Sequence, residues 1–274
     1  MSSTIARAQI QETPGGPTLV SPEQPMIGKR AVSLFPHLSA DASVPSGAPF
    51  KQDTPAAIRS FSIPGPAGRL EAILNQGAPN AGFAALVCHP HPSFGGNLHN
   101  KVVYYAMKVL NDPQWGLGLP VLRFNFRGTG LSEGSHDGVA ENADVVAAID
   151  WLDREFQLPI VLAGFSFGAA MALHASVKSR WDGKSIHALA ALGLPLVAEF
   201  PQYQYPFLDS LRMRKLFLSG ERDQFAPATE MTRVVASAAE PRRLIFVPGA
   251  DHFFTDQLEP MQDALAGWLK EQLQ

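Results

Sequence analysis

Cysteine is almost absent from this sequence, because Cys88 is the only one among 274 residues. A single cysteine forms no intramolecular disulfide and supplies too few thiolates for a structural zinc cluster. The sequence therefore excludes a secreted disulfide scaffold. We expect a protein of the reducing cytoplasm.

Long apolar runs are also missing. The longest, Ala188–Ala198, is interrupted by Gly193 and Pro195 and is much shorter than the ~20 apolar residues that span a bilayer. The N-terminus has no basic start followed by an apolar core, so it does not resemble a secretory signal and is expected to be retained. We predict no membrane span.

Neither sign of charge is in large excess. The chain has 22 Lys and Arg residues against 25 Asp and Glu residues, which gives a formal net charge of −3. This balance provides no basic surface for phosphates or anionic lipid. We therefore expect a small-molecule substrate, and not nucleic acid, as the partner.

The first 53 residues differ in composition from the rest. They are rich in Pro, Ser and Ala, their few charges cancel, and their apolar patches are short. This composition predicts a poorly ordered N-terminal extension over residues 1–53. The extension is either a variable tail without a role or a segment that docks on the domain or on a partner. Residues 54–274 contain no repeat and are predicted to form one domain.

From Ala57 onward, short apolar runs alternate with amphipathic stretches, which predicts an α/β fold with a mostly parallel sheet and helices on both faces. The turn-forming segment Pro64–Gly68 predicts an opening hairpin at a sheet edge, and continuous apolar runs predict buried strands after it. The predicted strands are Ile58–Ile63, Arg69–Asn75, Phe83–Cys88, Pro120–Asn125, Pro159–Ala163, Ala188–Gly193, Lys215–Ser219 and Leu244–Val247. The predicted helices are Asn100–Leu110, Asn142–Phe156, Phe167–Val177, Ala228–Ala238 and Pro260–Leu273.

The most informative segment is LPIVLAGFSFGAAMALHA, in which an apolar strand runs through G-F-S-F-G into a helix of small residues. Such a sharp turn strains the backbone at Ser166 and brings the helix against the strand, so the positions two before and two after the serine must lack side chains. Gly164 and Gly168 meet this requirement. The pattern predicts a nucleophile elbow with Ser166 as the nucleophile, and the alternative is a glycine-rich turn with an inert serine.

A serine hydroxyl needs a base within hydrogen-bonding reach, and the base needs an acid that holds its tautomer. His252 stands in the loop after the last predicted strand, at the carboxyl end of the sheet, and is the expected base. After the preceding strand we favour Asp223 over Glu221 as the acid. Asp251 is too close to His252 in the chain to reach its Nδ1 atom. The order Ser166, Asp223, His252 is the one expected for an α/β-hydrolase triad.

An oxyanion hole is the third requirement. One donor is the N–H of the residue after the nucleophile, here Phe167, and the other comes from the loop after the first buried strand. That loop reads CHPHPSFGGNLHNK. Pro90 and Pro92 have no N–H, which leaves the backbone of His91 as the expected second donor.

The same loop invites a metal interpretation, since His89, His91 and His99 are close in sequence and imidazole binds zinc. No acidic or thiolate partner with suitable spacing accompanies them. We therefore expect turn-shaping histidines, no metal site and no cofactor.

The elements HPHPSFGGNLHNK, RFNFRGTGLSEG, GFSFG, SGERDQFAP and GADHFF occur in this order. In order and spacing they resemble the small lidless α/β-hydrolases related to the dienelactone hydrolases and serine aminopeptidases. The resemblance extends from Ile58 to the C-terminus. It implies an eight-stranded, mostly parallel sheet with Ser166 as nucleophile, Asp223 as acid and His252 as base. Dienelactone hydrolases themselves use a cysteine nucleophile, so Ser166 argues against that specific activity.

Lids in this fold commonly follow the strand that here ends near Gly193, and the next predicted strand begins at Lys215. This leaves room for about one helix, so we expect an open pocket. Aromatic residues could line an apolar face of that pocket, or they could merely pack the helix onto the sheet. The candidates are Phe165, Phe167, Phe200, Tyr203, Tyr205, Phe207 and Phe253.

The sequence thus predicts a cofactor-independent serine hydrolase that acts through an acyl-enzyme on small or medium carboxylic esters. A thioesterase or a peptidase with the same triad is an alternative, as is a non-catalytic ligand-binding protein on the same fold.

In the loop after Asn125 we interpret Arg127 as a brace, with a contact to an anionic substrate group as the alternative.

Overall fold

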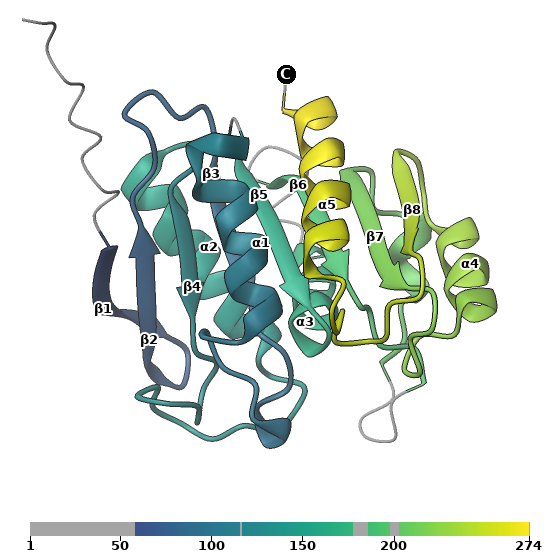
Figure 1. The fold of residues 1–274 in the computed structure, drawn as a ribbon. Helices are drawn as coiled ribbons and strands as arrows, with labels where there is room; N and C mark the ends of the chain where they lie inside the picture. Colours follow the sequence, from purple (N-terminus) through teal and green to yellow (C-terminus); the bar gives the residue numbers. More distant parts are fainter. Residues whose placement is uncertain (1–57, 116, 178–185, 198–202, 274) are drawn as a thin grey trace, which may run out of the picture. The chain divides into compact units, whose positions relative to one another are not determined.

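The described residues, 58–115, 117–177, 186–197 and 203–273, contain an eight-stranded sheet in the order β1-β2-β4-β3-β5-β6-β7-β8 (Figure 1). β2 pairs antiparallel with β1 and with β4, and the other neighbours are parallel. The strands are β1 (Ile58–Gly65), β2 (Gly68–Asn75), β3 (Ala84–Cys88), β4 (Val121–Phe124), β5 (Ile160–Phe165), β6 (Ile186–Leu192), β7 (Arg214–Gly220) and β8 (Arg242–Val247). The mostly parallel sheet and its opening hairpin are confirmed. The predicted extension over residues 1–53 lies outside the described residues.

Helices cover both faces of the sheet, as predicted (Figure 1). The buried side chains of α1 and α5 belong to one core cluster, and those of α2, α3 and α4 belong to another on the opposite face. The helices are α1 (Lys101–Asn111), α2 (Asn142–Phe156), α3 (Phe167–Ser176), α4 (Ala228–Ser237) and α5 (Leu258–Gln272). Each of the five lies within two residues of its predicted bounds at both ends.

The start of α1 shows how one side chain sets a helix boundary. Asn100, predicted as its first residue, instead caps the helix, because its Oδ1 accepts the N–H of Val102 at 3.0 Å. A cap of this kind satisfies one of the donors that a helix leaves free at its N-terminus. The helix therefore begins one residue later, at Lys101, and buries Val103, Ala106 and Leu110 against the sheet.

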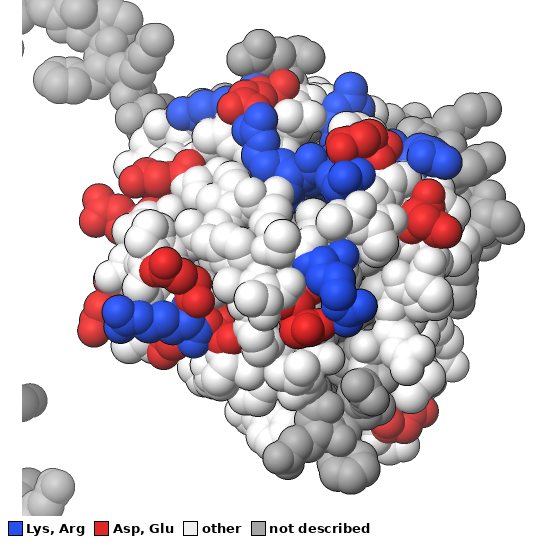
Figure 2. Space-filling model, turned by 90° about the vertical axis from the view of Figure 1, so that its right-hand side faces the viewer, with Lys and Arg blue, Asp and Glu red and all other residues white. Residues whose placement is uncertain are grey.

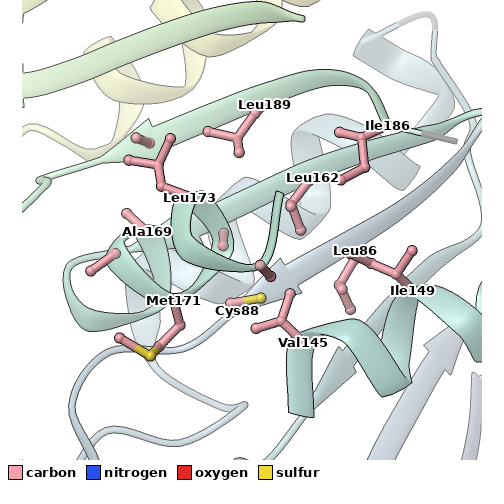
Figure 3. Packing of buried hydrophobic residues seen from close by; sticks show 14 of the residues in the cluster. Leu86, Cys88, Val145, Ile149, Leu162, Ala169, Met171, Leu173, Ile186 and Leu189 are labelled. Atoms are coloured by element: carbon pink, nitrogen blue, oxygen red, sulfur yellow. The ribbon is translucent and has the colours of Figure 1, made fainter. Parts of the chain in front are cut away.

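The larger core cluster holds α3 in place (Figure 3). Leu162 of β5 and Leu189 of β6 are fully buried there, together with Leu173 of α3 and Ile149 of α2. Helix α3 contacts both the sheet and α2, and all but one of its residues are buried. A helix enclosed on several sides is expected to be apolar around its whole circumference, which the sequence of α3 satisfies.

The burial predicted for the last strand is wrong. The apolar run Leu244–Val247 predicts a strand covered on both faces, but β8 is only partly buried apart from Val247. The strand is the last one in the sheet, so it has a neighbour on only one side. It also begins earlier than predicted, with Arg242 and Arg243, and Arg243 reaches Glu271 of α5 at 2.6 Å.

The segment between β6 and β7, where a lid could lie, contains the short 3-10 helix η4 (Pro206–Asp209) among its described residues. The hydroxyl of Tyr205 donates to the carbonyl of Pro195 at 2.9 Å, which ties the residue before η4 to the residues that follow β6. Phe200 lies outside the described residues.

The surface on the side of β8 and α4 carries charges of both signs, close to one another (Figure 2). Ion pairs join Arg233 to Glu230 and Arg242 to Glu240. Exposed pairs such as these contribute about 0–1 kcal/mol each. No helix in the described ranges is both long and apolar enough to cross a bilayer.

The packing around β5 makes a prediction for stability. Leu162→Ala leaves a cavity in the core and is expected to lower the free energy of unfolding by about 2–5 kcal/mol. The same change at Leu131, which is 82% exposed, should alter it by less than about 0.5 kcal/mol. Chemical denaturation measures both, and equal effects of the two substitutions would contradict the assigned core.

Candidate active site

Ser166 stands at the turn between β5 and α3. Its backbone has φ 53° and ψ −119°, a conformation that non-glycine residues rarely adopt. Strain of this kind persists only where the surrounding structure fixes it, and it concentrates at functional sites. The turn lies at the carboxyl edge of the sheet, where the parallel strands end, so the serine side chain is only partly buried.

The two glycines that flank Ser166 permit this turn. A Cβ atom on Gly164 would lie 2.4 Å from the carbonyl oxygen of Gly168, and one on Gly168 would lie 2.4 Å from the carbonyl oxygen of Cys88. No real side chain tolerates such contacts, so the backbones of β3, β5 and α3 meet here only because these residues lack side chains. The physical requirement inferred from the sequence is present in the structure.

Two further loops bring a histidine and a carboxylate to Ser166. His252, which follows β8, places its Nε2 atom 2.9 Å from the Oγ atom of Ser166. Its Nδ1 atom lies 2.9 Å and 3.0 Å from the two carboxylate oxygens of Asp223, which follows β7. Both side chains are almost completely shielded from solvent. The structure therefore joins the three side chains in one hydrogen-bonded chain.

Asp223 is held by its own loop. Its Oδ1 atom accepts the N–H groups of Phe225 at 2.8 Å and Ala226 at 3.1 Å, and the hydroxyl of Ser219 lies 3.4 Å from its Oδ2 atom. Backbone donors aimed at a carboxylate stabilise the ionised form and fix its orientation. The carboxylate is thus prepared to accept the Nδ1–H of His252.

The two other acidic candidates serve their own loops. Glu221 accepts the N–H of Gly249 at 2.8 Å. Asp251 accepts the N–H groups of Phe253 and Thr255, and Thr255 also donates its hydroxyl to it at 2.8 Å. Neither carboxylate is directed to Nδ1 of His252, which Asp223 occupies.

Aromatic rings surround the imidazole of His252. Its ring centroid lies 4.7 Å from that of Phe225, 5.2 Å from Phe253 and 5.3 Å from Phe165. Phe165 is buried and also packs on Phe254, so it supports the histidine from the core. Phe253 is 55% exposed and is the most exposed ring of this group.

A second set of rings surrounds Phe167, the residue after Ser166. Its centroid lies 4.9 Å from His91, 5.2 Å from Phe126 and 6.0 Å from Tyr203. Because Phe167 is the first residue of α3, its N–H has no carbonyl partner within the helix. The structure thus brings the side chains of His91 and Phe167, the two residues predicted to supply oxyanion donors, into ring contact.

The remaining predicted aromatics differ in their environment. Tyr203 is half-buried, and its hydroxyl donates to the carbonyl of Gly138 at 3.2 Å. Tyr205 and Phe207 pack on His174 of α3, with centroids 5.8 Å and 4.9 Å away. This contact matches the alternative in which these two residues hold the segment onto the domain.

The histidine-rich loop is organised by His89, which is completely buried. Its Nδ1–H donates to the carbonyl of Pro90 at 2.6 Å, and its Nε2 accepts the N–H of Phe126 at 3.0 Å. These partners require the neutral ring, and burial lowers its pKa from 6.5 to about 3. Among the described residues, no group of three or more His, Cys, Asp and Glu side chains is placed to hold a metal ion.

Arg127 is engaged within the protein. Its guanidinium makes contacts of 2.6–3.1 Å with both carboxylate oxygens of Asp144, and its backbone N–H donates to the same carboxylate at 3.0 Å. Asp144 is fully buried in α2. These contacts give Arg127 the bracing position that we inferred for it.

One further polar pair lies beside Phe167 and was not predicted from the sequence. His136 and Glu141 lie in the connection between β4 and α2, with Nδ1 of the histidine 2.6 Å from Oε1 of the glutamate. They are five residues apart in a loop that matches no periodic pattern, so only the folded chain reveals their contact.

The chain resembles known proteins in sequence and in fold. A sequence model of the α/β hydrolase domain family matches residues 106–264. An uncharacterised protein of Rickettsia prowazekii is 36% identical over 215 residues, which cover 75% of this chain and 86% of that protein.

Solved structures agree with this match. A lidless α/β serine hydrolase from Xanthomonas campestris has a TM-score of 0.66 and 29% identity, covering 79% of this chain and 95% of that one. An α/β serine hydrolase homologue from Coxiella burnetii also has a TM-score of 0.66, with 31% identity, covering 77% of this chain and 97% of that one.

The neutral His89 predicts a pH-dependent contribution to stability. The unfolded chain takes up a proton at this residue below pH 6.5 and the folded chain does not until about pH 3, so the contribution is present above 6.5 and is lost as pH falls. His89→Gln keeps an acceptor for Phe126 but does not titrate. The stability difference between wild type and variant should shrink by about 2 kcal/mol from pH 7 to pH 5. A difference that is independent of pH, measured by urea unfolding, would contradict this account.

Proposed function

The chain belongs to the α/β hydrolase family of hydrolytic enzymes, and we propose that it is a serine hydrolase that cleaves small or medium carboxylic esters through an acyl-enzyme. One observation carries the proposal. The Oγ atom of Ser166, the ring of His252 and the carboxylate of Asp223 form a continuous chain of contacts of 2.9–3.0 Å. A partly exposed serine linked in this way to a buried histidine–carboxylate pair has the arrangement of an activated nucleophile.

Acylation follows from this geometry. Nε2 of His252 takes the hydroxyl proton of Ser166 while Oγ forms a bond to the carbonyl carbon of the ester, and the carbonyl π electrons move to its oxygen. Asp223 accepts the Nδ1–H and stabilises the resulting imidazolium. The oxyanion then collapses, the bond to the leaving oxygen breaks, and His252 returns the proton to that oxygen as the alcohol departs.

Deacylation repeats these steps with water in place of the serine. His252 takes a proton from the water as its oxygen attacks the acyl carbon, and the same proton then returns to Oγ of Ser166 as the carboxylic acid leaves. In both half-reactions the N–H groups of Phe167 and His91 are proposed to hold the oxyanion. Donors fixed in position before the reaction stabilise the transition state without reorganisation.

The substrate preference rests on the aromatic side chains near the site. Exposed Phe253, beside His252, and half-buried Tyr203, beside Phe167, offer apolar walls to an acyl or alkyl group. The relative from Xanthomonas campestris is described as a serine hydrolase without a lid, which agrees with an open site for esters of modest size. Thioesters and peptides differ from esters only in the leaving group, so a substrate panel should include them.

The triad roles are tested by kinetics on an activated ester such as p-nitrophenyl acetate. Ser166→Ala removes the nucleophile, and Asp223→Asn leaves His252 without the acceptor that fixes its tautomer. Each is expected to lower kcat by roughly ten-thousand-fold or more while the fold is retained. Glu221→Gln, a change of the same kind in the Asp223 loop, is the control and should keep kcat within about threefold. Equal activity of Asp223→Asn and Glu221→Gln would contradict the proposed role of Asp223.

A further inference from the structure

His136 and Glu141 form a second buried histidine–carboxylate pair. Glu141 is fully buried, and its Oε1 atom accepts the N–H of Asp137 at 2.9 Å in addition to lying 2.6 Å from Nδ1 of His136. The pair sits in the connection that follows β4. Since β4 is parallel to β3 and β5, this connection belongs to the same carboxyl edge of the sheet as Ser166.

The pair has unused capacity for hydrogen bonds. Within the part of the chain that the structure describes, Oε2 of Glu141 is shielded from solvent and has no hydrogen-bond partner. The hydroxyl of Thr129, in the same connection, has none either. Buried polar atoms without partners are rare in folded proteins and costly to maintain. Two of them in residues 129–141, one of which belongs to the pair, indicate that this connection can bind a further polar group.

Ring contacts connect this pair to the candidate active site. The centroid of His136 lies 4.7 Å from that of His91 and 5.5 Å from that of Phe167, the two residues proposed to supply the oxyanion donors. The side chain of His136 is 15% exposed, whereas that of Glu141 is fully buried. His136 is therefore the member of the pair that a substrate can reach, with Glu141 behind it.

Around the pair, carboxylates outnumber guanidinium groups. Arg127 is close to Glu141, but its guanidinium is occupied by Asp144. Asp137 adds another carboxylate, and the N–H groups of Ala140 and Val139 lower its pKa, which keeps it ionised. Burial raises the pKa of Tyr203, and the negative charge of Glu141 raises it further. The charge of Glu141 therefore acts on a residue beside Phe167. A negative potential of this kind favours a cation over an anion.

The two sets of rings indicate which part of a substrate meets this pair. The leaving oxygen must lie next to His252, which returns the proton to it, and His252 is surrounded by Phe165, Phe225 and Phe253. His136 belongs to the other set, around Phe167. The acyl chain, which points away from the leaving group, is therefore the part directed toward His136.

We propose that His136 and Glu141 form a substrate subsite that takes a positively charged hydrogen-bond donor, an ammonium group, at the end of the acyl chain. This inference rests on the proposed ester hydrolysis at Ser166. An ammonium N–H donates to Nε2 of His136, the Nδ1–H of the same ring faces Glu141, and the buried carboxylate supplies the charge that compensates the cation. His136 is then a residue that determines specificity and takes no part in bond cleavage.

Three ethyl esters that differ only in the last group of the acyl chain test the proposal. The ester of β-alanine ends in an ammonium group, and the ester of butanoic acid ends in a methyl group. The monoester of succinic acid ends in a carboxylate group. Charge-assisted hydrogen bonds discriminate by roughly tenfold or more. The wild-type kcat/KM, measured by acid release at constant pH, should be at least about tenfold higher for the β-alanine ester than for the butanoate and lowest for the succinate. Hydrolysis of the butanoate ester equal to or faster than that of the β-alanine ester would overturn the subsite.

Substitutions test whether the preference for the β-alanine ester arises at His136 and Glu141. Glu141→Gln removes the buried charge at constant volume and should reduce the ratio of the β-alanine to the butanoate ester to near one. His136→Leu should reduce it as well. Glu133→Gln is the matched control, since Glu133 lies in the same connection but pairs with exposed Arg69. It should preserve the ratio. A ratio that is unchanged in Glu141→Gln would assign the preference to another site and overturn the proposal.

Binding without turnover separates this inference from the proposed function. In the Ser166→Ala background, calorimetry should show tighter binding of the β-alanine ester than of the butanoate ester, and the added Glu141→Gln change should abolish the difference. If wild type hydrolyses no ester but this binding pattern is present, the proposed function fails and the subsite stands. If butanoate is hydrolysed and neither kinetics nor binding favours the cation, the subsite alone fails.

Discussion

The close approach of three backbone segments at Ser166 is the constraint on which the rest of the site depends. Strand β5 turns into α3 so tightly that a Cβ atom on Gly164 or Gly168 would lie 2.4 Å from a neighbouring carbonyl oxygen. This approach fixes the unusual backbone of Ser166 and directs the first N–H of α3 toward the same edge of the sheet. Helix α3 packs against both the sheet and α2 (Figure 3). The side chains on its inner faces must therefore be apolar.

The parallel sheet supplies the other parts of the site. The strands β3, β5, β7 and β8 end at one edge, so the loops that carry His91, Asp223 and His252 converge on the serine without any long insertion. Hydrogen bonds within each loop hold these residues before a substrate arrives. Backbone donors orient Asp223, and buried His89 joins the β3 loop to the backbone of Phe126. Such preorganisation is what electrostatic stabilisation of a transition state requires.

Much of this could be predicted from the sequence, because the informative features are local. Apolar runs and helical spacing located the strands and helices, and G-F-S-F-G located the turn. Features that depend on contacts between distant segments could not be predicted in the same way. The edge position of β8, which leaves it partly exposed, follows from the order of the sheet. The burial of Phe165 behind His252, and the contact of His136 with Glu141, exist only in the folded chain.

The proposed function requires that the buried histidine and carboxylate activate Ser166 for attack. The most direct test is intact-mass spectrometry after incubation with a fluorophosphonate, which phosphonylates an activated serine and leaves ordinary serines unmodified. We expect one adduct per chain in the wild type and none in Ser166→Ala. A folded wild type that forms no adduct, or an adduct that persists in Ser166→Ala, would contradict it.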